Sequence, residues 1–427
     1  MKLIIFTIFT ILSSTYSNAA NTNTLPPIKI LFKKYVFVDF QTVEYNVTID
    51  LDKKIVTTKS LITFNQKEEG HVIFDLKGLS AKVTLDQKRV KLKKILIPSA
   101  HTLAKSISLR TKAGSHNLSV RAKLSKGISF KDDFEMGLWM RDLFGRKFLE
   151  QYLPTNFEFD QYKAKLNINF IGGNLSDFTL ITNGKKTITE TGYAVDFPYF
   201  YTASSFFIHI FNKDKYEMNK TEYTRLDGRK IDFIVYSNNK ELTKKLKIKA
   251  LTSIQELEQI YGSWPHNYLI VFGDQDAGGM EHAGATQTSL GSLDHELHHS
   301  YFSRSVLPRN GNAGWMDEAI VTWRDRGYPL NKIPNFKKTN LACHSIYRRS
   351  TDWDSYKKGG NFIGHLAYLF SMKGLSFKET LRSYFQAYKF QVVTTKTLRL
   401  FLEKAYGESL DQKFRRYLCN NKMNLSV

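Results

Sequence analysis

The chain has 427 residues, a formal net charge of +22 and only two cysteines, Cys343 and Cys419. These numbers exclude a metal site of the Cys-x-x-Cys kind, and about 400 residues are too many for one hydrophobic core, so we expect two domains. The basic residues are scattered and form no specific nucleic-acid-binding module, so a solvated surface is favoured, although the charge is also compatible with an anionic partner surface.

The first twenty residues have the pattern of a secretory signal peptide. Lys2 precedes the apolar stretch Leu3–Leu12, and Ser17-Asn18-Ala19 is a small-residue cleavage site. We therefore expect an exported protein, periplasmic or secreted, with an uncleaved anchor as the alternative. No later stretch of about twenty apolar residues predicts a transmembrane helix in the mature chain. In an oxidising compartment the two cysteines could pair, which the sequence does not decide.

Residues 21–212 are expected to form a β-rich domain. Alternating apolar and polar residues recur there, and turn signals such as Gly172-Gly173-Asn174 separate the runs. The expected strands include residues 45–50, 72–76, 164–170 and 178–182.

Residues 213–427 change to a mixed, helix-rich pattern. Ile231–Tyr236 and Tyr268–Phe272 are predicted strands, and Glu241–Tyr261 is a predicted helix with apolar residues at helical spacing. A further helix is expected to begin at Asp317 or Glu318 and to run to about Tyr328, before Pro329.

The run His295-Glu296-Leu297-His298-His299 is the strongest signal in the chain. On a helix, positions i and i+4 lie on one face, so His295 and His299 can bind one ion. Glu296 lies beside that face, where it can act on a water molecule as a general base. His298 lies on another face and is expected to pack.

Glu318 follows after eighteen intervening residues and is the expected third ligand. A catalytic zinc takes three protein ligands and keeps one open position. We therefore predict one Zn²⁺ per chain. An acid one turn after Glu318 would orient a ligand, but Thr322 occupies that position, so such support must come from elsewhere.

Upstream stands Gly278-Gly279-Met280-Glu281-His282. The two glycines allow close approach of a substrate backbone, and an extended peptide could pair with this segment as an added strand. The carboxylate of Glu281 is expected to bind a substrate's free α-ammonium.

These residues, in this order, resemble the alanyl aminopeptidase (aminopeptidase N-like) family of zinc metallopeptidases. That family has Gly-x-Met-Glu-Asn, then HExxH, then Glu, then a catalytic Tyr in Tyr-x-Lys-Gly. Here Tyr356-Lys357-Lys358-Gly359 matches the last motif, and the resemblance implies that Tyr356 stabilises the oxyanion. His282 replaces the family's Asn, as in the glycyl aminopeptidase relatives.

A weaker similarity covers the segment Leu153–Asp160. The family has an acid or Gln nine positions before the Pro of this motif, and here that position is Gly145. Two alternatives are open: Glu150 or Gln151 substitutes for it, or amine recognition depends mainly on Glu281.

The resemblance implies an α+β fold. We expect an N-terminal β-rich domain, then a thermolysin-like, helix-rich zinc peptidase domain over residues 213–427, without the family's large C-terminal helical domain. The expected activity is removal of N-terminal residues from peptides by zinc-activated water. Two alternatives stay open, a thermolysin-like endopeptidase and a non-catalytic binding protein on a peptidase scaffold.

Overall fold

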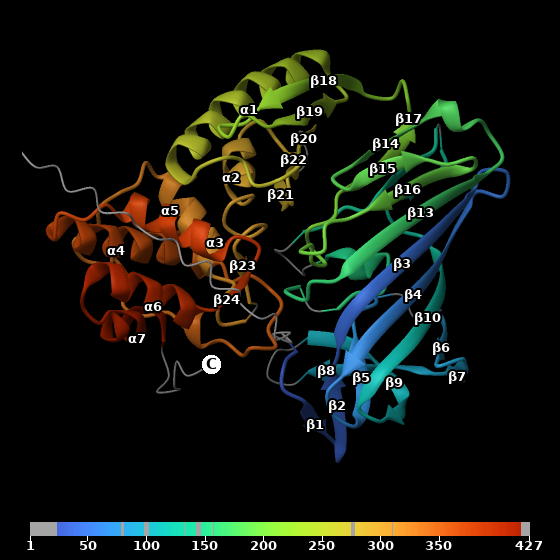
Figure 1. The fold of residues 1–427 in the computed structure, drawn as a ribbon, viewed down its shortest axis with the longest axis horizontal. Coiled ribbons are helices and arrows are strands. Elements are labelled where there is room, and N and C mark those ends of the chain that lie inside the picture. Colours follow the sequence, from blue (N-terminus) through green and yellow to red (C-terminus); the bar gives the residue numbers. More distant parts are fainter. Residues whose placement is uncertain are drawn as a thin grey trace, which may run out of the picture.

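The computed structural model describes residues 24–77, 81–97, 102–131, 133–141, 147–156, 158–274, 278–309 and 311–419. The expected signal peptide and Gly145 lie outside these ranges. Sheets make up the N-terminal part, and helices gather around the C-terminal part, as expected for the α+β class (Figure 1).

The largest sheet has eight described strands in the order β15-β16-β13-β3-β4-β10-β6-β7. In β4 every second residue is buried, among them Ile62 and Phe64, because successive side chains point to opposite faces of a strand. The bounds are β3 Asp39–Asp50, β4 Ile55–Gln66, β6 Lys82–Leu85, β7 Lys88–Val90, β10 Gly114–Leu124, β13 Lys163–Ile171, β15 Lys185–Ile188 and β16 Gly192–Asp196.

The exposed face of this sheet carries a row of like charges. Arg121 on β10 lies opposite Lys59 on β4 and also opposite Lys82 on β6. All three side chains are exposed, and none makes an ion pair with a described residue. Like charges in directly opposite positions of a sheet repel each other. Because these three residues have no described acidic partner, their positive charge is not balanced locally.

Two smaller sheets complete the N-terminal part. Their orders are β1-β2-β5-β9-β8 and β11-β12-β17-β14. The four expected strands over residues 45–50, 72–76, 164–170 and 178–182 correspond to β3, β5, β13 and β14. The bounds are β1 Ile28–Ile30, β2 Lys33–Phe37, β5 Gly70–Phe74, β8 Leu92–Ile97, β9 Thr102–Thr111, β11 Ile128–Ser129, β12 Glu135–Gly137, β14 Phe178–Thr182 and β17 Ile208–Asn212.

The C-terminal part contains another five-stranded sheet, in the order β18-β19-β20-β22-β21, and the two-stranded pair β23-β24. β19 and β20 contain the two strands expected in this half. The bounds are β18 Glu217–Thr224, β19 Lys230–Ser237, β20 Tyr268–Gly273, β21 Gly279–His282, β22 Ala285–Thr288, β23 Leu307–Pro308 and β24 Val392–Val393.

Helix α1, Lys240–Tyr261, confirms the predicted helix. The side chain of Asn239 accepts a hydrogen bond from the amide of Leu242 and so caps the N-terminus. Leu246, Ala250 and Ile254 lie on its fully buried face. The other helices are α2 Leu293–His298, α3 Met316–Asp325, α4 Gly360–Met372, α5 Phe377–Tyr388, α6 Thr395–Tyr406 and α7 Asp411–Leu418.

Helix α3 ends three residues earlier than expected. The prediction that it runs to Tyr328 is wrong, because Gly327 and Tyr328 have φ values of 74° and 59°, which a right-handed helix cannot contain. Pro329 therefore follows a turn.

The hydrophobic cores cross the predicted boundary at residue 212. Met280 and Ala283, from the C-terminal half of the chain, belong to the core of the large sheet. Phe211 and Tyr236, from the two sides of the boundary, pack in one cluster. The division into residues 21–212 and 213–427 therefore stays a prediction.

Cys343 and Cys419 form a disulfide bond, with 5.3 Å between their Cα atoms. Thr339 is held nearby, because its amide and its hydroxyl both donate to the carbonyl of Tyr417, at 2.9 and 2.8 Å. The segment that leads to Tyr356 is thus fixed to α7.

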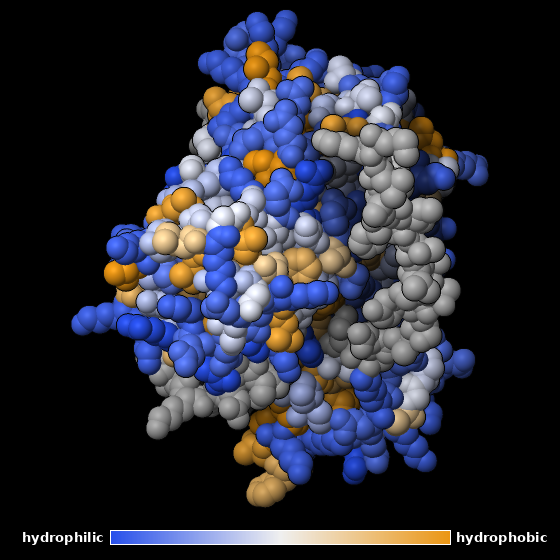
Figure 2. Space-filling model, turned by 60° about the vertical axis from the view of Figure 1, so that its left-hand side comes forward, coloured by the Kyte–Doolittle hydropathy of each residue, from blue (hydrophilic) through white to orange (hydrophobic). Residues whose placement is uncertain are grey.

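The face in Figure 2 is mostly hydrophilic, with hydrophobic residues in small separate groups. Within the described part of the chain, no helix has both the length and the apolar character needed to cross a membrane.

Candidate metal and catalytic site

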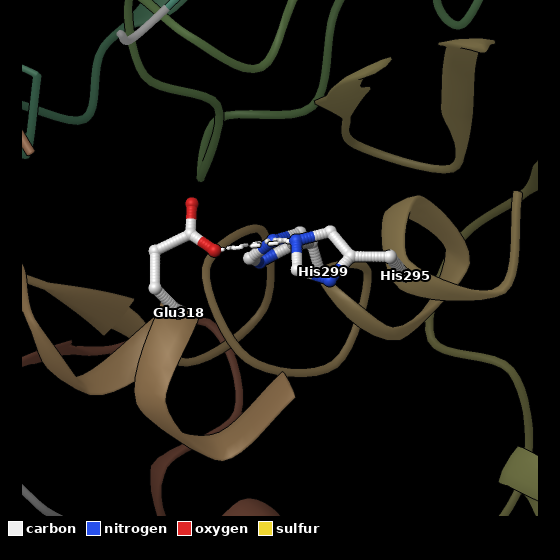
Figure 3. Close-up of side chains that lie close together, drawn as sticks. All are labelled: His295, His299 and Glu318. Atoms are coloured by element: carbon white, nitrogen blue, oxygen red, sulfur yellow. Dashed lines mark hydrogen bonds and ion pairs between the residues drawn. The ribbon is translucent and has the colours of Figure 1, made fainter. Parts of the chain in front are cut away.

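Helices α2 and α3 bring three predicted ligands together (Figure 3). His295 lies within α2, and His299, directly after its last residue, keeps helical dihedral angles, so both rings stay on one face. Their Nε2 atoms are 3.1 Å apart. Glu318, in the first turn of α3, places its Oε2 atom 3.2 Å from Nε2 of His295 and 3.4 Å from Nε2 of His299.

This donor set fits a zinc ion. Oε2 of Glu318 is buried and receives no hydrogen bond from any described residue. Burial alone would raise the pKa of Glu318, but His299 and His295 hold it well below its usual range. Two imidazoles and one carboxylate are the ligands of many catalytic zinc sites, so these residues can hold that ion.

Asp325 orients one of the imidazoles. Nδ1 of His295 donates to Oδ2 of Asp325 over 2.6 Å, so Nε2 is the nitrogen that faces Glu318. Asp325 lies seven positions after Glu318, two turns along the same face of α3. A supporting acid was expected one turn after Glu318, where Thr322 stands, so Asp325 was not predicted, although its i+7 spacing is visible in the sequence.

Helix α2 is also fixed from the side. Asp294 pairs with Lys249 over 3.0 Å and accepts a short hydrogen bond from Ser253, both on α1. His298 is fully buried and stacks on Tyr261, with the ring centroids 5.2 Å apart. It therefore packs and does not join the ligand group, as expected.

Glu296 lies against the ligand group. One of its carboxylate oxygens, one of Glu281 and a nitrogen of His299 all lie within 4.8 Å of one another. Burial raises the pKa of Glu296 to about 8, against the lowering effect of His295. A carboxylate with a raised pKa near neutrality is suited to accept and return a proton.

Gly279 leaves the space that Glu296 occupies. A Cβ atom at Gly279 would lie 2.0 Å from Oε1 of Glu296, whereas a Cβ atom at Gly278 would contact nothing within 4 Å. The two glycines therefore differ in role, and the sequence alone did not separate them.

Tyr356 reaches the site from a π-helical turn, Ser355–Gly359. Its hydroxyl donates to Oε1 of Glu318 over 2.8 Å, and its ring lies parallel to that of His295, at 6.1 Å between centroids. The phenol thus lies at the edge of the ligand group, as the motif predicted.

Strand β21 forms one wall of the site and is the edge strand of its sheet. The cavity is lined by Gly278, Gly279, Glu281, Gly291, Ser292, His295, Glu296, His299, Glu318 and Tyr356. Met280 instead points into the core of the large sheet, where it is 2% exposed. His282 is buried, and Nδ1 of His282 donates to the carbonyl of Phe206, away from the ligands.

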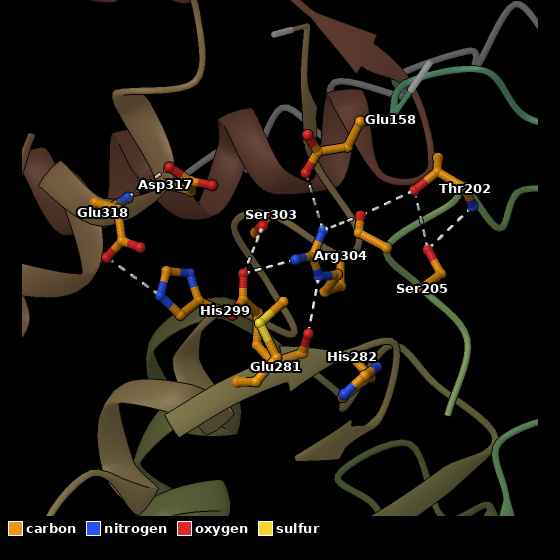
Figure 4. Close-up of polar contacts among 12 residues, drawn as sticks. Glu158, Thr202, Ser205, Glu281, His282, His299, Ser303, Arg304, Asp317 and Glu318 are labelled. Atoms are coloured by element: carbon orange, nitrogen blue, oxygen red, sulfur yellow. Dashed lines mark hydrogen bonds and ion pairs between the residues drawn. The ribbon is translucent and has the colours of Figure 1, made fainter. Parts of the chain in front are cut away.

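Glu281 is not an isolated carboxylate (Figure 4). Its Oε1 atom accepts from Nη2 of Arg304 over 2.7 Å, and the hydroxyl of Ser303 lies 3.5 Å away. Burial would raise the pKa of Glu281, but Arg304 keeps it lowered. Arg304 was not predicted as a site residue, because no local sequence pattern links positions 281 and 304.

No described residue of the weaker N-terminal motif lines the cavity, although a carboxylate oxygen of Glu158 lies 3.9 Å from Nη1 of Arg304. Oδ2 of Asp160 accepts from the amide of Phe40 and from the side chain of Asn156, so these residues bind the β-rich part together. Glu150 and Gln151 are buried and do not line the site.

No model of a known protein family matches the chain, and no curated protein matches it. Solved structures do match. An M1 zinc metallopeptidase of Deinococcus radiodurans, a mutant bound to a Tyr-Ser-Ala substrate, is 13% identical, with a TM-score of 0.59 over 91% of this chain and 95% of that chain. Aminopeptidase A of Legionella pneumophila, in complex with aspartic acid, is 13% identical, with a TM-score of 0.65 over 89% of this chain and 49% of that one. Native yeast LTA4 hydrolase is 14% identical, with a TM-score of 0.61 over 91% and 68%. The chain has the fold of these three proteins.

Proposed function

We propose that this protein is a zinc peptidase of the aminopeptidase N-like family and that it removes residues from the N-termini of peptides. The observation that carries the proposal is the convergence of His295, His299 and Glu318 on one point, with Oε2 of Glu318 buried and without a hydrogen bond among the described residues. Glu296 and Tyr356 line the same cavity.

Glu296 and Tyr356 have different proposed roles in hydrolysis. A bound zinc would supply Lewis-acid polarisation of the scissile carbonyl and would acidify water. Glu296 takes the proton of the attacking water and returns it to the leaving amine. The hydroxyl of Tyr356 turns from Glu318 to donate a hydrogen bond to the oxygen that becomes negatively charged.

Substrate positioning falls to β21. Because β21 is an edge strand, its backbone can pair with an extended peptide, and Gly278 places no side chain in the way. Glu281 lines the same cavity and is the proposed partner of the substrate's α-ammonium.

The test uses one peptide in two forms, with a free and with an acetylated N-terminus, and zinc-loaded protein. Stepwise release of single residues from the free form supports an aminopeptidase. Internal cleavage of both forms at equal rates favours the endopeptidase. The endopeptidase is the second candidate because Glu281 already forms an ion pair with Arg304. Binding without cleavage of either form indicates the binding protein.

Glu296→Gln separates chemistry from metal binding. The variant should keep zinc and lose turnover, because the amide cannot accept the proton. The control is Glu256→Gln, since Glu256 lies on the exposed side of α1, pairs with Arg324 of α3 and does not line the site cavity. Turnover retained in Glu296→Gln would remove Glu296 from the mechanism.

We also propose that the protein is exported. The pattern of residues 1–20 and the pairing of Cys343 with Cys419 support an oxidising compartment, where disulfides persist. The uncompensated row of Lys59, Lys82 and Arg121 supports an anionic partner surface.

A further inference from the structure

The hairpin formed by β1 and β2 ends in two apolar side chains that are almost completely exposed. Leu31 and Phe32 make up the whole connection, because Ile30 at the end of β1 lies opposite Lys33 at the start of β2. They are 86% and 106% exposed, the two highest values among the large hydrophobic residues of the described chain. Figure 1 places this hairpin at the lower end of the molecule, and that end is hydrophobic in Figure 2.

The backbone of this turn is also unfavourable for the residues that occupy it. Leu31 and Phe32 have φ values of 47° and 62°, the left-handed conformation that Asn-Gly adopts most readily in a two-residue hairpin turn. Bulky residues in this region raise the free energy of the folded chain, and exposed apolar side chains gain no burial that would offset it. Two unfavourable features at the same two positions therefore point to a partner outside the chain that receives both side chains.

Lysine side chains stand beside the tip on both faces of the hairpin. Lys29 lies opposite Lys34, and Lys33 lies opposite Ile30, so Lys29 and Lys33 point to opposite faces. Both are exposed, and neither makes an ion pair with a described residue, whereas Lys34 pairs with Glu68. The tip is thus apolar at its end and positively charged on both sides of that end.

This arrangement fits the surface of an anionic lipid bilayer. Large apolar side chains can enter the boundary between headgroups and acyl chains, while long lysine side chains keep their ammonium groups at the level of the lipid phosphates. A bilayer surrounds an inserted tip on every side, which agrees with exposure all round and with lysines on both faces. A protein partner would need one apolar pocket for both side chains with acidic groups on two sides of it, so the bilayer is favoured.

We propose that Leu31 and Phe32 insert into an anionic membrane surface and that Lys29 and Lys33 bind its phosphate groups, so that this hairpin attaches the protein to a membrane. The inference goes beyond the proposed peptidase function and does not depend on it. The hairpin does not line the cavity of the proposed metal ligands, so attachment and hydrolysis can be measured separately.

The test measures binding to vesicles of equal parts phosphatidylcholine and phosphatidylglycerol by co-sedimentation. It uses the proposed exported form, residues 21–427, because the apolar stretch Leu3–Leu12 could itself enter a bilayer. The informative variant combines Leu31→Asn with Phe32→Gly, the pair that suits this turn. We expect the double variant to bind the vesicles about 10-fold or more weakly, with an equal or higher melting temperature.

Three further variants sharpen the result. Ile333→Asn is the matched control, since Ile333 is 70% exposed in the segment after α3, and should leave binding unchanged. Lys29→Gln combined with Lys33→Gln should weaken binding to the anionic vesicles by about 10-fold. Phe32→Trp should bind like the wild type, and the fluorescence of the added indole should shift to shorter wavelength on vesicles, because the ring leaves water.

Several outcomes would overturn the inference. Equal binding of the wild type and the double variant would move the contact to another basic surface, such as the row of Lys59, Lys82 and Arg121. No binding of the wild type to the anionic vesicles would contradict it directly. A lipid-free dimer that only the wild type forms would show that a second copy covers the tip. If the double variant does not fold, Phe32→Trp decides, since fluorescence unchanged by vesicles contradicts insertion.

Discussion

Asp325 accepts a hydrogen bond from Nδ1 of His295 over 2.6 Å, two turns along α3 from Glu318. One helix therefore supplies both a proposed metal ligand and the acid that orients another ligand. The seven-residue spacing of Glu318 and Asp325 on α3 therefore fixes how far the ligand carboxylate lies from the orienting carboxylate.

Asp325→Asn should weaken zinc binding by about 10- to 100-fold, because the amide no longer fixes the His295 ring or raises its basicity. Competition with a chromophoric chelator measures the effect. Asp411→Asn is the control, since Asp411 pairs with Arg415 on α7, and should leave the affinity as it is. Equal affinities in the wild type and Asp325→Asn would show that the contact does not tune the metal.

Gly279→Ala should lower kcat by about 100-fold while zinc stays bound, because the new Cβ atom displaces Glu296 from its position. Gly278→Ala is the comparison one residue earlier, where the Cβ atom meets no protein atom within 4 Å and leaves Glu296 in place, so the methyl group should raise KM by obstructing the substrate and should lower kcat far less than Gly279→Ala. Steady-state kinetics with a metal assay on the same samples compares them. Equal kcat values in the two variants would contradict the steric link.

Tyr356→Phe should reduce kcat by about 100- to 1,000-fold with little change in zinc content, since one donor to the developing oxyanion is lost. The control is Tyr347→Phe, whose hydroxyl donates to the carbonyl of Pro26. A rise in KM at constant kcat would instead assign Tyr356 to substrate binding.

Zinc uptake should strengthen as the pH rises from 6 to 8. In the metal-free protein burial lowers the pKa of both ligand histidines, but Asp325 and Glu318 raise that of His295 to about 11, and Glu318 and Glu281 raise that of His299 to about 10. Both imidazoles must lose a proton to bind metal, so the apparent dissociation constant should fall by about 10-fold per pH unit for each proton released. A dissociation constant independent of pH would contradict these raised values.

The same shifts affect the stability of the metal-free protein. A histidine whose folded pKa is raised stabilises the fold fully below its unfolded pKa of 6.5 and loses that contribution as the pH rises through the folded value. The melting temperature of the metal-free protein should therefore fall between pH 6.5 and about 10, as differential scanning calorimetry can measure.

The parts of the site that were predictable from sequence depend on local spacing. His295 and His299 are four positions apart on one helix, so their shared face follows from helix geometry alone. Glu318 was predicted as the third ligand because it follows the HExxH motif after eighteen residues, as in the family that the sequence resembles. Arg304 could not be found in this way, because its contact with Glu281 depends on how β21 and the segment after α2 pack together.

The fold shows the same division between local and long-range information. Helix α1 and the strands of the large sheet follow their apolar periodicity, because each buries one face. The sheet order, in which β13 pairs in parallel with β3 over a long connection, has no local signal. The end of α3 was predicted too late because Pro329 was taken as the residue that stops the helix, whereas the turn at Gly327 ends it earlier.

The disulfide between Cys343 and Cys419 imposes an order on the assembly of the protein during synthesis. The three proposed metal ligands have been synthesised once Glu318 has left the ribosome, but the core that packs α2 and α3 also contains later residues such as Phe362 and Phe414. The loop that carries Tyr356 is fastened only after Cys419 has emerged and been oxidised. The packing of the metal ligands and the fastening of the segment that carries Tyr356 therefore both depend on the last hundred residues of the sequence, and oxidation of the two thiols is the step that closes this part of the fold.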